Sequence, residues 1–129
     1  MANAIETLYK SLKTEYEPTI KVRYPYIYDD TQVPYIYMYE VDDPRIPNYL
    51  CDTTGGQSRL TIGYLSTRFA DCVDKLDTII NFCNTLHGDY TGIEITQVFS
   101  GNTRDLTDMN NSQRRIYRRE FDIILFWSK

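Results

Sequence analysis

The side-chain pattern of residues 114–127 predicts one long β-strand, and both of its faces are suited to contacts with other parts of a protein. Successive side chains of a strand point to opposite faces, so every second residue belongs to one face. One face has five large apolar side chains and is predicted to be core. The other mixes charged with large apolar groups, which favours contact with another protein over contact with water alone. The core face comprises Tyr117, Phe121, Ile123, Leu125 and Trp127, and the mixed face comprises Ile116, Arg118, Glu120, Asp122, Ile124 and Phe126.

The length and composition of the chain limit the class of protein to which it can belong. A chain of 129 residues is long enough to bury a core without disulfides, which predicts a single domain over residues 1–129. The formal net charge of −4 argues against a general nucleic-acid binder, because that class needs surplus Lys and Arg. The twelve tyrosines exceed ordinary usage, and tyrosine is enriched at protein interfaces. Composition therefore favours a protein that acts through contacts with other proteins.

The beginning of the sequence and its cysteines indicate the compartment. Residues 1–7 lack the features of a signal peptide, and no apolar run is long enough to span a membrane. Cys51, Cys72 and Cys83 have no metal-binding spacing, and their odd number fits reduced thiols. On one predicted helix Cys72 and Cys83 would lie about 16 Å apart, too far for a disulfide. We expect a cytosolic chain with buried free thiols and no membrane contact.

Apolar periodicity and turn residues predict helix, three strands, helix and two strands. We expect an α+β fold in which a mostly antiparallel sheet is packed by one long helix plus an N-terminal helix, with a long C-terminal hairpin. The order has no regular alternation of strand and helix, which argues against a doubly wound parallel sheet. The first expected segments are a helix at 2–14, strands at 19–24 and 33–41, a loop at 42–56 and a strand at 59–65. A helix follows, from a cap at Ser66 or Thr67 to Leu86, and Gly88 is expected to stop it. The last segments are a strand at 92–99, a polar loop at 100–113 and the final strand.

Catalytic and metal-binding signals are weak throughout the chain. The sole histidine, His87, is expected at a helix C-terminus as a capping residue, and it is too isolated for a zinc site. The paired acids Asp29–Asp30 and Asp42–Asp43, with Asp105 and Asp108, could suggest a hard-cation site, but none has EF-hand spacing. The glycines at 55–56 lack the Lys-Ser/Thr pair of a phosphate loop. We therefore expect no catalytic residues, no cofactor and no metal.

Two sequence features favour protein–protein contact. The strand at 33–41 has tyrosines on one face and Ile36 and Met38 on the other, which predicts core plus interface, with an aromatic binding groove as the alternative. The arginines of residues 114–119 precede two acids, which favours ion pairing over phosphate contact. The surplus apolar surface predicts oligomerisation. The candidate interface residues are Tyr35, Tyr37, Tyr39, Arg45, Tyr49, Arg104, Asp105, Arg114, Arg115, Arg118 and Glu120.

The order of elements and the terminal strand, which contains Arg-Arg-Glu-Phe-Asp-Ile-Ile-Leu-Phe-Trp at 118–127, resemble the tail terminator or tail completion proteins of long-tailed bacteriophages. The resemblance covers the whole chain and rests on architecture without a diagnostic motif. It implies a homo-hexameric ring that caps the tail tube, stops its growth and joins it to the neck and head-completion protein.

By the same resemblance, the virion's genome would pass through the ring without sequence-specific binding, and an acidic lumen would keep it from adhering. The chain would act at the tail–neck junction after assembly in the host cytoplasm. The loops at 42–56 and 100–113 would meet neighbouring rings. The alternatives are another head–tail connector (head completion) protein, a small phage-encoded adaptor or inhibitor that binds a host protein, and an enzyme or nuclease accessory.

Overall fold

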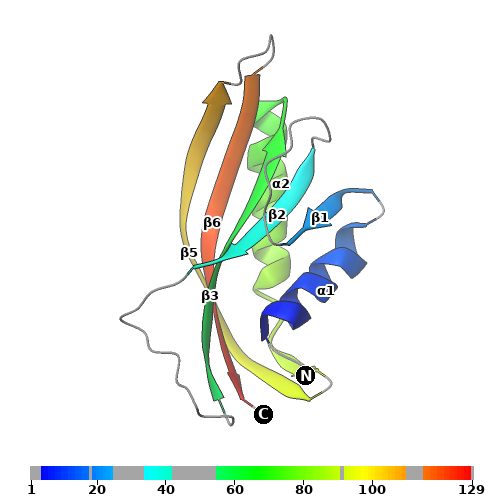
Figure 1. Cartoon of the computed structure of the whole chain (residues 1–129), viewed down its shortest axis with the longest axis vertical. Coiled ribbons are helices and arrows are strands. Elements are labelled where there is room, and N and C mark those ends of the chain that lie inside the picture. Colours follow the sequence, from blue (N-terminus) through cyan, green and yellow to red (C-terminus); the bar gives the residue numbers. More distant parts are fainter. Residues whose placement is uncertain are drawn as a thin grey trace.

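The computed structural model describes residues 4–17, 19–24, 34–41, 55–90, 92–109 and 115–128. Within them the chain is mixed α+β, with two helices and a six-stranded sheet (Figure 1). The strand order is β1-β2-β3-β6-β5-β4, and only the β1–β2 pair is parallel. The elements are α1 (Ala4–Tyr16), β1 (Lys21–Arg23), β2 (Tyr35–Glu40), β3 (Gly55–Ser66), α2 (Phe69–Cys83), β4 (Gly88–Tyr90), β5 (Ile93–Met109) and β6 (Arg115–Ser128).

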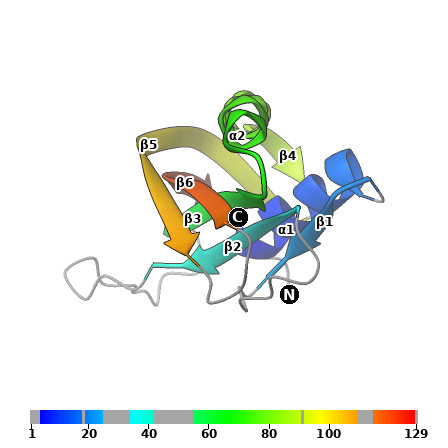
Figure 2. The same cartoon turned by 90° about the horizontal axis from the view of Figure 1, so that it is seen from above.

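Both helices lie on one side of the sheet, which curls around them (Figure 2). In α1, Ala4, Leu8 and Leu12 recur every four residues and so form one buried stripe. The buried residues of α2 follow one another at intervals of four, three and four residues and form a similar stripe. These stripes pack on alternate residues of the central strands and form the main core. From the two helices the main core takes Ala4, Leu8, Leu12, Cys72, Leu76, Ile79 and Cys83, and from the central strands it takes Ile36, Met38, Leu60, Ile62, Tyr64, Phe121, Ile123 and Leu125.

A second, smaller apolar cluster lies on the sheet face opposite the helices. It consists of Tyr35, Tyr37, Leu65 and Ile116, with Tyr39 packed against it. The strand at 35–40 therefore has two apolar faces, as its alternation predicts, and the core face predicted for β6 is confirmed. Cys72 and Cys83 are buried free thiols, also as expected.

The predicted polar loop at 100–113 is wrong over residues 100–109. These residues continue β5, because residues 103–109 pair with β6 in an unbroken register and so satisfy their backbone groups. Gly55 and Gly56 likewise belong to β3, whereas residues 42–54 and 110–114 lie outside the described residues. Gly101 and Asn102 are thus compatible with a strand whose partner is long enough.

The second helix is shorter than predicted. It runs from Phe69 to Cys83, with Arg68 at the N-cap position, and the Arg68 N–H donates to Ser66 Oγ at 3.2 Å. Gly88 begins strand β4 with φ +147° instead of ending the helix, and His87 lies beyond the helix rather than at its cap. No helix in the described ranges has the length and apolarity needed to span a membrane.

Candidate functional site

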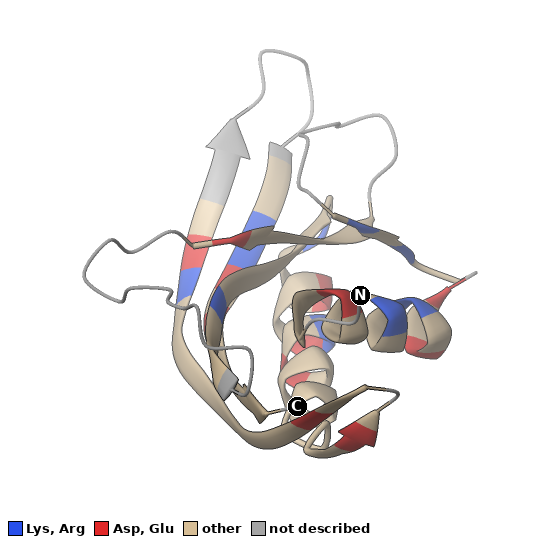
Figure 3. Cartoon of the chain, turned by 60° about the horizontal axis from the view of Figure 1, so that its bottom comes forward, with Lys and Arg blue, Asp and Glu red and all other residues tan. Residues whose placement is uncertain are grey.

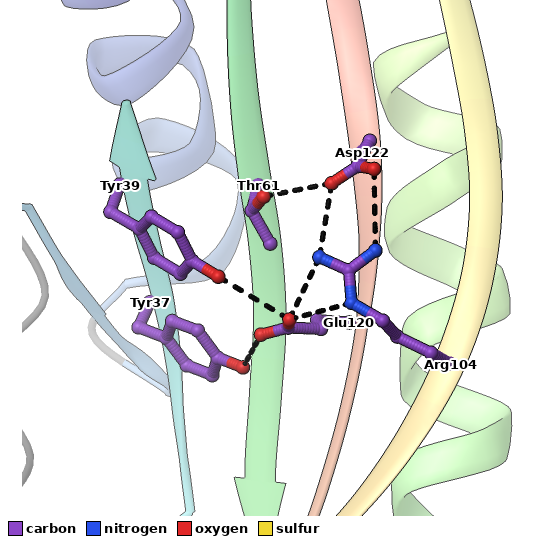
Figure 4. Close-up of polar contacts among 6 residues, drawn as sticks. All are labelled: Tyr37, Tyr39, Thr61, Arg104, Glu120 and Asp122. Atoms are coloured by element: carbon purple, nitrogen blue, oxygen red, sulfur yellow. Dashed lines mark hydrogen bonds and ion pairs between the residues drawn. The ribbon is translucent and has the colours of Figure 1, made fainter. Parts of the chain in front are cut away.

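Four residues form one lateral row across the middle of the sheet. Tyr37 of β2 is opposite Gly63 of β3, Gly63 is opposite Glu120 of β6, and Glu120 is opposite Arg104 of β5. Paired residues point to the same face, so the row lies on the face away from the helices. Together with residues of the adjacent row they form a polar network (Figure 4). We call it the Glu120 cluster, and it comprises Tyr37, Tyr39, Thr61, Arg104, Glu120 and Asp122.

The carboxylate of Glu120 is at the centre of this cluster and is only 3% exposed. It accepts hydrogen bonds from the hydroxyl of Tyr37 and, at 3.3 Å, from that of Tyr39. Arg104 donates to Glu120 Oε1 from Nε at 2.9 Å, and its Nη2 lies 2.8 Å from the same oxygen. A buried carboxylate requires such partners, because an uncompensated charge in the interior is very costly.

Arg104 also binds the carboxylate of Asp122. Its Nη1 and Nη2 donate to the two carboxylate oxygens at 3.2 and 3.1 Å, in the bidentate geometry that a guanidinium favours. The Thr61 hydroxyl donates to Asp122 Oδ1 at 2.8 Å. Burial alone would raise the pKa of Asp122, but the hydrogen bonds from Arg104 and Thr61 outweigh it and lower the pKa. The hydrogen bonds and charges of both acids raise the pKa of Arg104.

The absence of a side chain at Gly63 makes room for Tyr37. A Cβ atom at this position would lie 2.3 Å from Cζ and Oη of the Tyr37 ring, which is closer than real contacts allow. The ring therefore passes over the glycine of β3 to reach Glu120 on β6. The cluster thus ties four strands together, and its tightest packing point is a glycine.

The cluster has the chemistry of a structural brace. The Arg104 guanidinium is held between the carboxylates of Glu120 and Asp122. The tyrosine hydroxyls donate to Glu120, which is the less exposed of the two. In the described part of the chain, no three His, Cys, Asp or Glu side chains gather in a way that could hold a metal ion. Four of the predicted interface residues are brought together here. They are Tyr37, Tyr39, Arg104 and Glu120.

The other predicted interface residues lie outside this cluster. Tyr35 is fully buried, with the Arg23 guanidinium 4.8 Å from its ring centre. Asp105 accepts a hydrogen bond from Arg119 at 2.8 Å, and Arg118 is half-buried beside it on β6. Arg45, Tyr49 and Arg114 lie outside the described residues, as does the side chain of Arg115.

Burial changes the role that two of the tyrosines can have. Tyr35 and Tyr37 are 0% exposed, so they do not provide an accessible contact surface. Tyr39 is half-buried at the edge of the second cluster. Among the described residues, the large apolar side chains that remain exposed are Phe69 and Phe99, at 46% and 49%. In the described part of the chain, the apolar surface available for a partner is therefore smaller than the tyrosine content suggests.

Sequence reasoning missed Thr61, Gly63 and Asp122 as members of the cluster. The sequence predicts Asp122 on the same face of β6 as Glu120, two residues away. This shared face is the signal that could have paired Asp122 with Arg104. Thr61 and Gly63 had no such signal, because their place in the cluster depends on the register between β2, β3 and β6.

The outer edge of β5 is a second feature suited to contact. Along one side β5 pairs with β6 over residues 94–109, but along the other it pairs with β4 only over residues 93–95. Within the described residues, the edge at 96–109 has no strand partner. At about 3.3 Å per residue it is about 45 Å long. Phe99 lies on this strand, its ring packed edge-on against Phe126 at 5.7 Å.

No family model matches this chain, and a search of curated proteins found no significant match.

Proposed function

We propose that this protein is a ring-forming tail terminator of a long-tailed bacteriophage, a structural virion protein that caps the tail tube and joins it to the neck. The observation that supports self-assembly best is the edge of β5 at residues 96–109, which has no strand partner in the part of the chain that the structure describes. An edge strand offers a row of backbone N–H and C=O groups to another strand. Such an edge favours assembly with other copies or with neighbouring virion proteins.

The edge lacks most of the devices that prevent strands from pairing. Residues 96–109 include no proline and no lysine, which are the residues that commonly block an edge. Two irregularities, between Ile95 and Gln97 and between Ser100 and Thr103, interrupt the first half. From Thr103 onward the register with β6 is regular. The segment 103–109 is therefore the part of the edge best prepared to receive a strand.

The Glu120 cluster makes this edge firm. Arg104 lies on β5, and its ion pairs attach the strand to the centre of the sheet through Glu120 and Asp122. A strand that is held in place loses less conformational entropy on binding than a free one. The cluster thus supports a role in assembly through the strand that it holds, while the side chains of Arg104 and Asp122 are 38% and 35% exposed.

The remaining architecture fits the same proposal. We equate α2, which packs on β3 and β6, with the long helix of the tail terminator family, and the antiparallel β5–β6 pair with its terminal hairpin. The formal charge of −4 fits a protein that surrounds DNA without gripping it. The partners would be further copies of the chain in a hexamer, the tail tube protein and a head-completion protein, with no cofactor and no reaction.

Electron microscopy with purified tail tubes tests the proposal. The protein, added to tubes that lack a terminator, should form six-fold rings at one tube end and stop further growth when tube subunits are supplied. Asn81→Lys, on the exposed side of α2, should leave capping unchanged and serves as the matched surface control. A monomer that leaves tube growth unaffected at high concentration would refute the proposal, and recovery of one stoichiometric host protein would favour the adaptor function instead.

A further inference from the structure

Strand β5 consists of two halves that are attached to the molecule in different ways. In the first half, Ile93 and Ile95 are buried in the main core. A β-bulge at Gly101 and Asn102, where β6 provides only one residue, separates this half from residues 103–109, which we call the distal half. The bulge interrupts the regular pairing with β6, so the two halves need not open together.

The distal half contributes little apolar surface to the fold. Its described side chains, from Thr103 to Leu106, are exposed or half-buried. On one side it pairs with β6, and in the described part of the chain no strand lies on its other side. β6 stays in the sheet without it, because residues 117–121 of β6 also pair with β3. Few buried contacts and a single neighbouring strand are properties of segments that open locally.

Charged side chains on both faces of the distal half attach it to β6 (Figure 3). Arg104 lies on the face away from the helices and is bound to Glu120 and Asp122. Asp105 points to the opposite face, where its carboxylate lies 2.8 Å from Nη1 of Arg119. The side chains of Arg104 and Asp105 are 38% and 49% exposed, so salt in the solvent weakens these ion pairs. The attachment of residues 103–106 by their side chains is therefore mainly electrostatic.

We infer that the distal half of β5 is a detachable strand, which opens as a polar loop while the rest of the fold remains intact and closes when its charges pair with β6. Residues 100–105 are Ser, Gly, Asn, Thr, Arg and Asp, a composition that is also typical of loops. Sequence and structure thus describe two states of the same segment.

The detachable strand controls when the edge of β5 exists. An edge that is always present and lacks proline and lysine is prone to pair with unrelated strands. An edge that forms only in the closed state is present for part of the time, and a strand that binds it shifts the population towards that state. The closed state presents the edge that the proposed function uses, but the inference goes beyond that function and does not depend on it.

Native-state hydrogen exchange of the full-length protein, measured by NMR at increasing urea concentrations, tests the inference. The hydrogen-bonded amides of residues 103–109 should exchange at rates that hardly change with urea below the unfolding transition, because local opening exposes little surface. The amides that join β3 to β6 should exchange at rates that rise with urea, because they require global unfolding. A distal half with the same urea dependence as the β3–β6 amides would overturn the inference.

Asp105→Asn tests the electrostatic attachment. The variant should accelerate exchange of the distal half by roughly two- to fivefold, as expected for the loss of one exposed ion pair. At about 1 M NaCl the difference from the unmodified protein should shrink. Lys10→Gln removes the exposed ion pair with Glu6 on α1 and, as the matched control, should leave these amides unchanged. Equal exchange of Asp105→Asn and the unmodified protein would refute the electrostatic attachment. The measurement needs no assembled ring, so its failure is distinct from failure of the proposed function.

Discussion

Tyr37 lies directly over Gly63, and a single methyl group at this glycine would meet the tyrosine ring at 2.3 Å. The ring cannot move away without losing its hydrogen bond to Glu120, because this bond is what draws it across β3. The packing of the second cluster and the satisfaction of a buried carboxylate thus depend on one position.

We therefore expect Gly63→Ala to destabilise the protein by about 2 kcal/mol, which is typical of an overpacked interior site. Gly101→Ala is the matched control, since a Cβ there would meet Asp122 at an ordinary 3.5 Å, and its effect should stay within about 0.5 kcal/mol. Urea unfolding followed by circular dichroism measures both. Equal effects of the two substitutions would contradict the position of the Tyr37 ring.

Arg104→Ala should destabilise the fold by about 3 kcal/mol, because Glu120 would then be a buried carboxylate without its cation. Adding Glu120→Gln should recover part of this loss, since the neutral amide needs no cation. Arg119→Ala removes an ion pair with the exposed Asp105 and should cost at most about 1 kcal/mol. A double variant that is as unstable as the sum of the two single variants would show that Arg104 and Glu120 act independently.

The lowered pKa of Asp122 predicts a contribution to stability against acid. Because the carboxyl binds a proton less readily in the folded state, its contribution is complete above the unfolded pKa of about 3.9 and is lost as the pH falls through the folded pKa. Asp122→Asn should therefore lower Tm at pH 7 and flatten its decline below about pH 4. Thermal melts from pH 7 to pH 2.5 measure both slopes, and parallel curves would contradict the prediction.

Cys72 and Cys83 should be unreactive in the folded protein. Burial raises the pKa of the Cys83 thiol to about 12, and burial followed by the charge of Asp71 raises that of Cys72 to about 11, so little thiolate exists at pH 8. In Cys51→Ser, a thiol-specific chromogenic reagent should react only at the rate of unfolding, while the urea-unfolded chain should react at once at both thiols. Fast reaction of the folded protein would show that one of these helix positions opens to solvent.

The sequence contained enough information to predict both faces of β2 and the core face of β6, because apolar residues alternate there with period two. The second half of β5 was missed for the opposite reason. From Ser100 to Asp105 its side chains are mostly polar and exposed on both faces, so no hydrophobic period exists. What makes this segment a strand is its partner β6, a long-range pairing that local residue preferences do not encode.

The candidate site was only half visible in the sequence. Arg104 and Glu120 stood out as charged residues on predicted interface segments, but their mutual contact depends on the β5–β6 register. Gly63 and Thr61 enter through β3, whose register with two neighbours has to be known first. Tyr37 was predicted to serve both core and interface, and in the structure it is buried and donates to a carboxylate 83 positions away in the chain.

That long separation links the fold to protein synthesis. Tyr37 and Gly63 leave the ribosome well before Glu120. Until the last strand emerges, the hydroxyls of Tyr37 and Tyr39 therefore lack the carboxylate to which they donate. Only then can the hydroxyls, the carboxylates and Arg104 meet. A partly synthesised chain therefore cannot form the Glu120 cluster, because Glu120 and Asp122 both lie on the last strand.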